Sequence, residues 1–163
     1  MRADLPARRP LAKHGAVLEA VSRACRTAAG DTRAMDIASA PPRVADARAA
    51  AALVADLGIG PLERAAVLYL DPEWRFLGRA DFAGSADSVA PPLRTVVGEA
   101  LRLGASALVL AHGHPSGTIA PSAADLAYTR LLGRVAAAVD LRLVDHLIVA
   151  GGRIASLRDD GWM

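Results

Sequence analysis

The segment LVLAHGHPSG (108–117) constrains the fold of this chain more than any other stretch. Four apolar residues run directly into His112-Gly113-His114, and a Pro-Ser-Gly turn follows them. A short apolar run that ends in a turn is typical of a strand buried inside a sheet. The two histidines therefore stand where a buried strand emerges into a loop.

The sequence on both sides of this strand shows helical and extended patterns. Apolar residues at helical spacing predict helices over 44–57, 92–105 and 121–140. Apolar runs bounded by turn residues predict strands over 65–71, 74–80, 106–114, 141–150 and 153–159, the first two as an antiparallel hairpin. About five strands and three helices in this order predict an α/β fold, with a mixed sheet flanked by helices.

A length of 163 residues suits one globular domain with a real core. The pair Pro41-Pro42 marks a boundary, so we expect an N-terminal extension over 1–43 and one domain over 44–163. No stretch approaches the roughly 18 to 20 consecutive apolar residues of a membrane-spanning helix. The first residues, MRADLPARRP, lack the apolar centre of a secretory signal. We therefore expect a cytoplasmic protein with no membrane partner.

Charge is divided unevenly between these two parts. Residues 1–43 hold eight Lys and Arg against four Asp and Glu, whereas residues 44–163 hold eleven against thirteen. A basic arm can contact nucleic acid, but these charges are scattered among Ala and Pro, with no aromatic residue for base stacking. We interpret the extension as solvated and partly disordered, and nucleic acid as a less favoured partner.

The chain contains one cysteine, Cys25. A single thiol excludes an internal disulfide and every metal site that needs two thiolates. The zinc nucleoside deaminases are excluded with them, because they need a Cys-x-x-Cys pair. Any metal must therefore be held by histidine and carboxylate.

His112 and His114 provide half of such a site. Side chains two residues apart on an extended segment point the same way, so both imidazoles project from the strand end. A catalytic zinc ion takes three protein ligands, and Asp125, one turn into the third helix, is the leading candidate for the third. Ser122 and Asp125 also have the spacing of a helix N-cap with an acid in the first turn. That spacing alone favours the cap, whereas the nearby histidine pair favours a metal site.

A metal that cleaves amides also needs a general base. Glu63, before the first strand, and Glu99, in the second helix, are the candidates, and local spacing does not decide between them. Asp145 is a candidate for a hydrogen-bond partner that orients a ligating histidine. His146, in an apolar strand, is interpreted as a hydrogen-bonded core residue.

Together these residues resemble a known motif. His-x-His, seven residues, Ser, two residues and Asp, with a Glu upstream, is similar to the JAMM motif of MPN-domain metalloproteases. LVLAHGHPSG, LVDHLIVAGG and the terminal DDGWM resemble, in that order, segments of the bacterial RadC family of JAB domains. The resemblance covers roughly residues 60–163. It implies a JAB/MPN architecture, which is related to that of the cytidine deaminases.

The resemblance also implies a role for each motif residue. His112, His114 and Asp125 would bind Zn²⁺. Glu63 would be the general acid/base, and Ser122 would donate a hydrogen bond to the developing oxyanion. The implied reaction is zinc-dependent hydrolysis of a peptide or isopeptide bond in a peptide or protein substrate.

Three features depart from the family pattern. Gly113 stands where the family usually has Asn, and Ala90-Pro91-Pro92-Leu93 stands where it has His-Pro-Arg-Glu. Residues 1–43 do not resemble the helix-hairpin-helix module that family members commonly carry. We therefore keep one alternative function, a DNA-repair-associated or protein-interaction module whose metal site is structural or idle. The sequence gives no oligomeric state.

Overall fold

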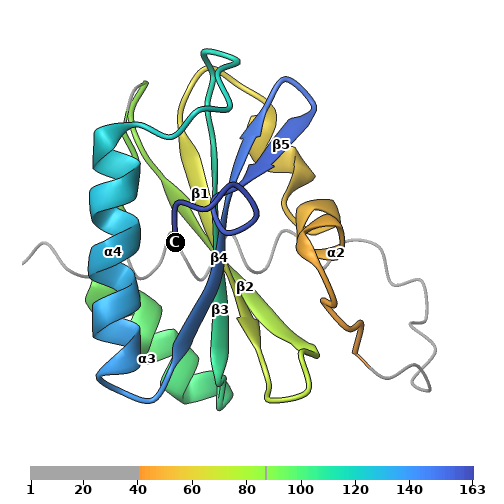
Figure 1. The fold of residues 1–163 in the computed structure, drawn as a ribbon, viewed down its shortest axis with the longest axis vertical. Helices are drawn as coiled ribbons and strands as arrows, with labels where there is room; N and C mark the ends of the chain where they lie inside the picture. Colours follow the sequence, from red (N-terminus) through yellow and green to blue (C-terminus); the bar gives the residue numbers. More distant parts are fainter. Residues whose placement is uncertain (1–40, 87) are drawn as a thin grey trace, which may run out of the picture. The chain divides into compact units, whose positions relative to one another are not determined.

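The computed structural model describes residues 41–86 and 88–163. In this part of the chain, one mixed sheet lies between two helical layers (Figure 1), which confirms the predicted fold class. Two helices cover one face of the sheet, and a short helix followed by a 3₁₀ turn covers the other. The predicted extension over 1–43 lies almost entirely outside the described residues.

The sheet has five strands in the order β2-β1-β3-β4-β5. The strands are β1 (Arg64–Leu70), β2 (Phe76–Ala83), β3 (Ala107–Gly113), β4 (Arg142–Ala150) and β5 (Arg153–Ser156). β3 and β4 are parallel, and all other neighbours are antiparallel. Because β3 is central and covered on both faces, every one of its residues is buried.

The parallel pairing of β3 with β4 determines where the chain turns. Parallel strands need a crossover connection, and here it contains α4 (Ala123–Ala137). α4 begins near the end of β3 because only a short loop, residues 114–122, joins the two elements. α3 (Leu93–Leu103) covers the same face of the sheet as α4 (Figure 1). This geometry brings the last residues of β3 and the first turn of α4 together at the same end of the sheet.

Alternate residues of the central strands supply two separate cores. Leu68 and Val109 face the layer formed by α2 (Ala47–Ala52) and η1 (Ala55–Gly58). Tyr69 and Leu110 face the opposite layer, where they pack with Leu132 of α4. This division follows from the two-residue repeat of a β-strand.

The single helix predicted over 44–57 is divided in the structure. α2 ends at Ala52, and η1 continues as a 3₁₀ turn. Val54 and Leu57, which are 0% and 2% exposed, both pack against the sheet. Residues three apart eclipse each other in a 3₁₀ helix, so the tighter turn presents both side chains to the core.

The second strand begins later than the predicted residue 74. Trp74 has a left-handed backbone (φ 66°) and belongs to the hairpin turn instead. Asp71 stabilises this turn, because its Oδ1 accepts hydrogen bonds from the backbone N–H groups of Glu73 (2.9 Å) and Arg75 (2.8 Å).

Gly113 permits a close approach between η1 and the end of β3. A Cβ atom at this position would collide with the backbone carbonyl of Leu57. We therefore expect Gly113→Ala to lower the free energy of unfolding by about 1–3 kcal/mol, as overpacking does elsewhere. Gly98 of α3 is a matched control, because a Cβ there meets no atom within 4 Å.

Gly98→Ala should raise the free energy of unfolding by about 0.5–1 kcal/mol, since alanine is the better helix former. Urea denaturation of both variants measures these changes. Equal stability of the two variants would contradict the close packing at Gly113.

None of the helices between residues 41 and 163 that the structure describes is long and apolar enough to cross a membrane.

Candidate metal centre

β3, the central strand, carries His112 to the end of the sheet at which the strand finishes. The Cα of His112 is paired with Ala65 of β1 and with Ile148 of β4. His114 follows directly after the strand, and its backbone N–H donates to the carbonyl of Val149 (2.9 Å). The two histidines are 3% and 9% exposed, and their Nε2 atoms are 2.7 Å apart. Both imidazoles therefore meet at one partly buried point.

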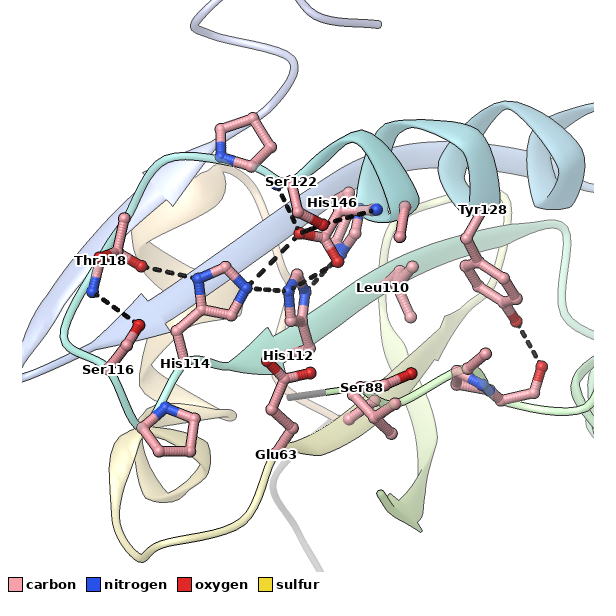
Figure 2. A pocket seen from close by; sticks show the side chains of 18 of the residues that line it. Glu63, Ser88, Leu110, His112, His114, Ser116, Thr118, Ser122, Tyr128 and His146 are labelled. Atoms are coloured by element: carbon pink, nitrogen blue, oxygen red, sulfur yellow. Dashed lines mark hydrogen bonds and ion pairs between the residues drawn. The ribbon is translucent and has the colours of Figure 1, made fainter. Parts of the chain in front are cut away.

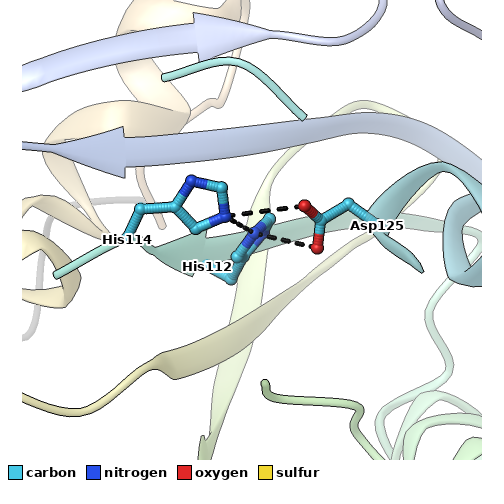
Figure 3. A group of neighbouring side chains, drawn as sticks. All are labelled: His112, His114 and Asp125. Carbon is cyan, nitrogen blue, oxygen red and sulfur yellow. Dashed lines mark hydrogen bonds and ion pairs between the residues drawn. The ribbon is translucent and has the colours of Figure 1, made fainter. Parts of the chain in front are cut away.

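The first turn of α4 brings Asp125 to the same point (Figure 3). Its Oδ1 is 3.2 Å from Nε2 of His112, and its Oδ2 is 3.5 Å from Nε2 of His114. One ligand atom from each of these residues lies within 4.8 Å of the other two. The structure thus brings together all three predicted metal ligands, in a group that could hold one metal ion.

Asp125 also belongs to a capping box at the start of α4. Its backbone N–H donates to Oγ of Ser122 (3.1 Å), while the Ser122 backbone N–H donates to Oδ2 of Asp125 (2.7 Å). The Ser122 hydroxyl donates to Oδ2 as well (2.6 Å). The cap therefore uses Oδ2 and leaves Oδ1 facing His112. A cap and a metal ligand are compatible in this residue.

The Asp125 carboxyl is ionised across the physiological range. Burial acts to raise its pKa, but hydrogen bonds from His112 and Ser122 outweigh burial and hold this pKa well below its usual range. The charged form is the one that binds a cation.

A chain of hydrogen bonds determines which nitrogen of His112 carries the proton. The hydroxyl of Thr129 donates to the Asp125 carbonyl (2.6 Å), so its oxygen accepts from Nδ1 of His146 (2.5 Å). Burial, with a contribution from neighbouring His112, lowers the pKa of His146 to about 3, so this ring is neutral. Its Nε2 therefore accepts from Nδ1 of His112 (2.8 Å). With its Nδ1 proton donated to His146, His112 would bind a metal ion through Nε2, which faces Oδ1 of Asp125.

His114 is held in the same tautomer by the backbone. Its Nδ1 lies 2.7 Å from the carbonyl oxygen of Thr118, which can only accept a hydrogen bond. Nδ1 therefore carries a proton, and Nε2, which faces Nε2 of His112, is the nitrogen left for a metal ion. Two imidazole nitrogens and a carboxylate oxygen then face one another, as the ligands of one cation would.

Glu63 lies beside this cluster, immediately before β1. Its side chain is 9% exposed and lines the same cavity of about 510 Å³ as His112 and His114. In Figure 2 its carboxylate points into the cavity toward the imidazoles. Glu99, the alternative base, forms an ion pair with Arg102 on α3 (2.6 Å) and does not line the cavity. The geometry therefore favours Glu63.

Ser122 lines the cavity as well, but its hydroxyl is hydrogen-bonded to Asp125. Its role as a donor to an oxyanion stays a prediction, since the hydroxyl must first leave the carboxylate.

Asp145 does not orient either histidine, which corrects one of the interpretations considered for it. Its carboxylate accepts hydrogen bonds from the Ser156 hydroxyl (2.7 Å) and from the backbone N–H groups of His146 and Arg158 (2.7 and 3.2 Å). Side chains alternate along β4, so the aspartate and the next residue leave opposite faces of the strand. Asp145 thus stabilises the β4–β5 end of the sheet.

Sequence reasoning identified His146 as a hydrogen-bonded core residue but missed that its partners are His112 and Thr129. The strand register explains the contact: His146 pairs with Leu110, two residues before His112, and therefore shares its face of the sheet. The sequence alone does not give this register, and a threonine inside an apolar helix likewise gives no indication of its partner.

Thr129→Val tests the hydrogen-bond chain. The substitution conserves shape but removes the acceptor of the His146 Nδ1 proton, so the proton position on His112 is no longer determined. We expect zinc affinity to fall about 10- to 100-fold, as for other partners of ligating histidines. Competition with a chromogenic chelator measures the affinity. Thr95→Val, at an exposed position of α3, is the control, and equal affinity in both variants would contradict the assignment.

The mixed sheet with a His-His-Asp group at its edge belongs to the JAB type of α/β domain. Residues 44–162 match the family model described as the RadC-like JAB domain, and the chain belongs to that family. The family resemblance derived from LVLAHGHPSG and the later segments is therefore confirmed.

Several bacterial relatives share this part of the chain. A UPF0758 protein of Acidithiobacillus ferrooxidans is 46% identical over 97 residues, which are 59% of this chain and 43% of that protein. A UPF0758 protein of Bordetella avium is 45% identical over 102 residues, 62% of this chain and 45% of that protein. One from Cellvibrio japonicus is 38% identical over 134 residues, 82% of this chain and 58% of that protein. The chain thus spans about half the length of these curated relatives, whose names state no activity.

Proposed function

We propose that this chain is a zinc-dependent hydrolase that cleaves peptide or isopeptide bonds. One observation carries the proposal: Nε2 of His112, Nε2 of His114 and Oδ1 of Asp125 converge beside Glu63, in one cavity. Two nitrogen ligands and one carboxylate oxygen suit Zn²⁺, and three protein ligands are typical of a catalytic rather than a structural zinc site.

The donor set fits the ion, which would replace the present contacts among the two Nε2 atoms and Asp125 while the hydrogen bonds at Nδ1 stay in place. Nδ1 of each ligating imidazole is engaged by the protein, so Nε2 of His112 and of His114 is available. When bound, zinc supplies Lewis acidity, which acidifies water and polarises a carbonyl group.

Glu63 would perform the proton transfers. Its carboxylate would accept a proton from the water that attacks the amide carbon and pass that proton to the leaving nitrogen. A carbon–oxygen bond forms, the carbon–nitrogen bond breaks, and the amine leaves neutral. Ser122, which lines the same cavity, would turn from Asp125 and donate a hydrogen bond to the carbonyl oxygen as negative charge develops there.

The experiment is metal analysis and hydrolysis on the same purified preparation. We expect about one zinc ion per chain, and cleavage of amide bonds in a library of peptides and isopeptides. Treatment with a chelator should stop cleavage, and added zinc should restore it. A protein that takes up no zinc when it is offered would refute the proposal. Zinc binding without cleavage of any substrate would favour the alternative, a module with a structural or idle metal site.

A further inference from the structure

The cavity beside the histidines has two walls. One is formed by residues 86 and 88–91, which precede α3, and the other is the loop 114–121 that follows β3. The Tyr128 hydroxyl of α4 donates to the carbonyl of Pro91 (2.5 Å), which ties the first wall to the helix (Figure 2). Burial raises the pKa of Tyr128 to about 12, so its hydroxyl stays protonated at physiological pH and continues to donate this hydrogen bond. The first wall is therefore held in place beside Glu63.

Charge is scarce on these walls. Among the described residues that line the cavity, Glu63 and Asp125 are the only carboxylates, and none is a Lys or an Arg. Most of the other lining residues have small, apolar or hydroxyl side chains, among them Ala65, Ala90, Pro91, Leu110 and Ala120.

One basic residue, Arg153, lies behind one wall, but its guanidinium already donates a hydrogen bond to the protein backbone. The guanidinium of Arg153 donates to the carbonyl of Gly117 (2.6 Å), within the loop 114–121, and Arg153 does not line the cavity. A negatively charged group against these walls, away from the metal position, would therefore lose water without gaining a cationic partner from the described residues.

We infer that the cavity selects a short peptide segment with uncharged side chains and rejects one with acidic side chains next to the scissile amide. This inference rests on the proposed function and names its substrate class. A volume of about 510 Å³ lies within the range of about 300–1,000 Å³ that is typical of small-ligand sites. It suits a few residues of an extended peptide. Burial of an unpaired carboxylate is strongly unfavourable, whereas burial of a neutral amide of the same shape is not.

The test compares isosteric probes without turnover. N-acetyl trialanine amides that carry Asn or Asp at each position in turn are titrated into the full chain, stripped of metal with a chelator. Backbone chemical shifts in NMR spectra report the affinity and the residues contacted. We expect the Asn peptide to bind at least about tenfold more tightly than its Asp counterpart, at the positions that enter the cavity.

A charge added to the wall should reverse the preference. The side chain of Ala90 is exposed and lines the cavity, so an arginine fits there without entering a core. In Ala90→Arg the affinity for the Asp peptide should rise about tenfold, while the affinity for the Asn peptide should change little. Ala138→Arg, at an exposed position beyond α4, adds the same charge elsewhere and should change neither.

Each outcome separates this inference from the proposed function. If the protein binds Asn peptides selectively but cleaves nothing, the inference is supported and the proposed hydrolase function is refuted. If the zinc-loaded wild type cleaves Asp peptides efficiently, the proposed hydrolase function is supported and the inference is overturned. Equal affinities for both peptides, no effect of Ala90→Arg, or no binding of any neutral peptide would also overturn it.

Discussion

Glu63→Gln is expected to lower the rate of amide hydrolysis by about 10²- to 10⁴-fold, the usual contribution of a general acid/base. The amide has the shape of the carboxylate but cannot accept the proton of the attacking water. Glu63 is not one of the three side chains that converge on the metal position, so zinc content should stay at the wild-type level. Steady-state kinetics and metal analysis of the same preparation measure both quantities.

Glu99→Gln is the matched control for this substitution. It makes the same chemical change on α3, where the carboxylate pairs with Arg102 at the surface. Its kcat should remain within about twofold of wild type, since loss of an exposed ion pair has little effect. Hydrolysis retained in Glu63→Gln, or lost equally in both variants, would show that Glu63 is not the base.

His114→Ala is expected to abolish zinc binding at micromolar protein concentration. The substitution removes one of three protein ligands and leaves His112 and Asp125, which cannot complete a typical site. The histidine follows β3 and packs in no apolar cluster of the described residues, so the fold should survive. Metal analysis after dialysis against buffered zinc, together with circular dichroism, tests both statements.

Ser116→Ala, in the same loop, controls for disturbance of the loop itself. Ser116 is exposed and its hydroxyl only accepts a long hydrogen bond from the Thr118 backbone (3.4 Å). This variant should bind zinc as the wild type does. If His114→Ala kept its zinc while wild-type protein was fully loaded, the metal would have to lie elsewhere.

The sheet and its helices could be predicted because their patterns are local. The apolar run before His112 and the helical stripes over 92–105 and 121–140 correspond closely to β3, α3 and α4. The break between α2 and η1 could not be predicted in this way. It depends on how Val54 and Leu57 meet strands that come later in the chain.

The convergence of His112, His114 and Asp125 could be anticipated because all three lie within 14 residues, around one strand end and one helix start. The positions of the protons on the two imidazole rings could not be anticipated in this way. They depend on His146, which lies 34 residues from His112, and on a threonine hydroxyl whose partner only the packing of α4 on β4 reveals. Assignment of Glu63 rather than Glu99 likewise required the family resemblance or the cavity itself.

The closeness of the three ligands in sequence affects how metal and folding influence each other. A segment of 14 residues can bring two imidazoles and a carboxylate together even when the rest of the chain is denatured, since closure of a short loop costs little entropy. We therefore expect the denatured ensemble to retain some affinity for zinc. Saturating zinc should raise the melting temperature by less than its dissociation constant from the native state alone would give.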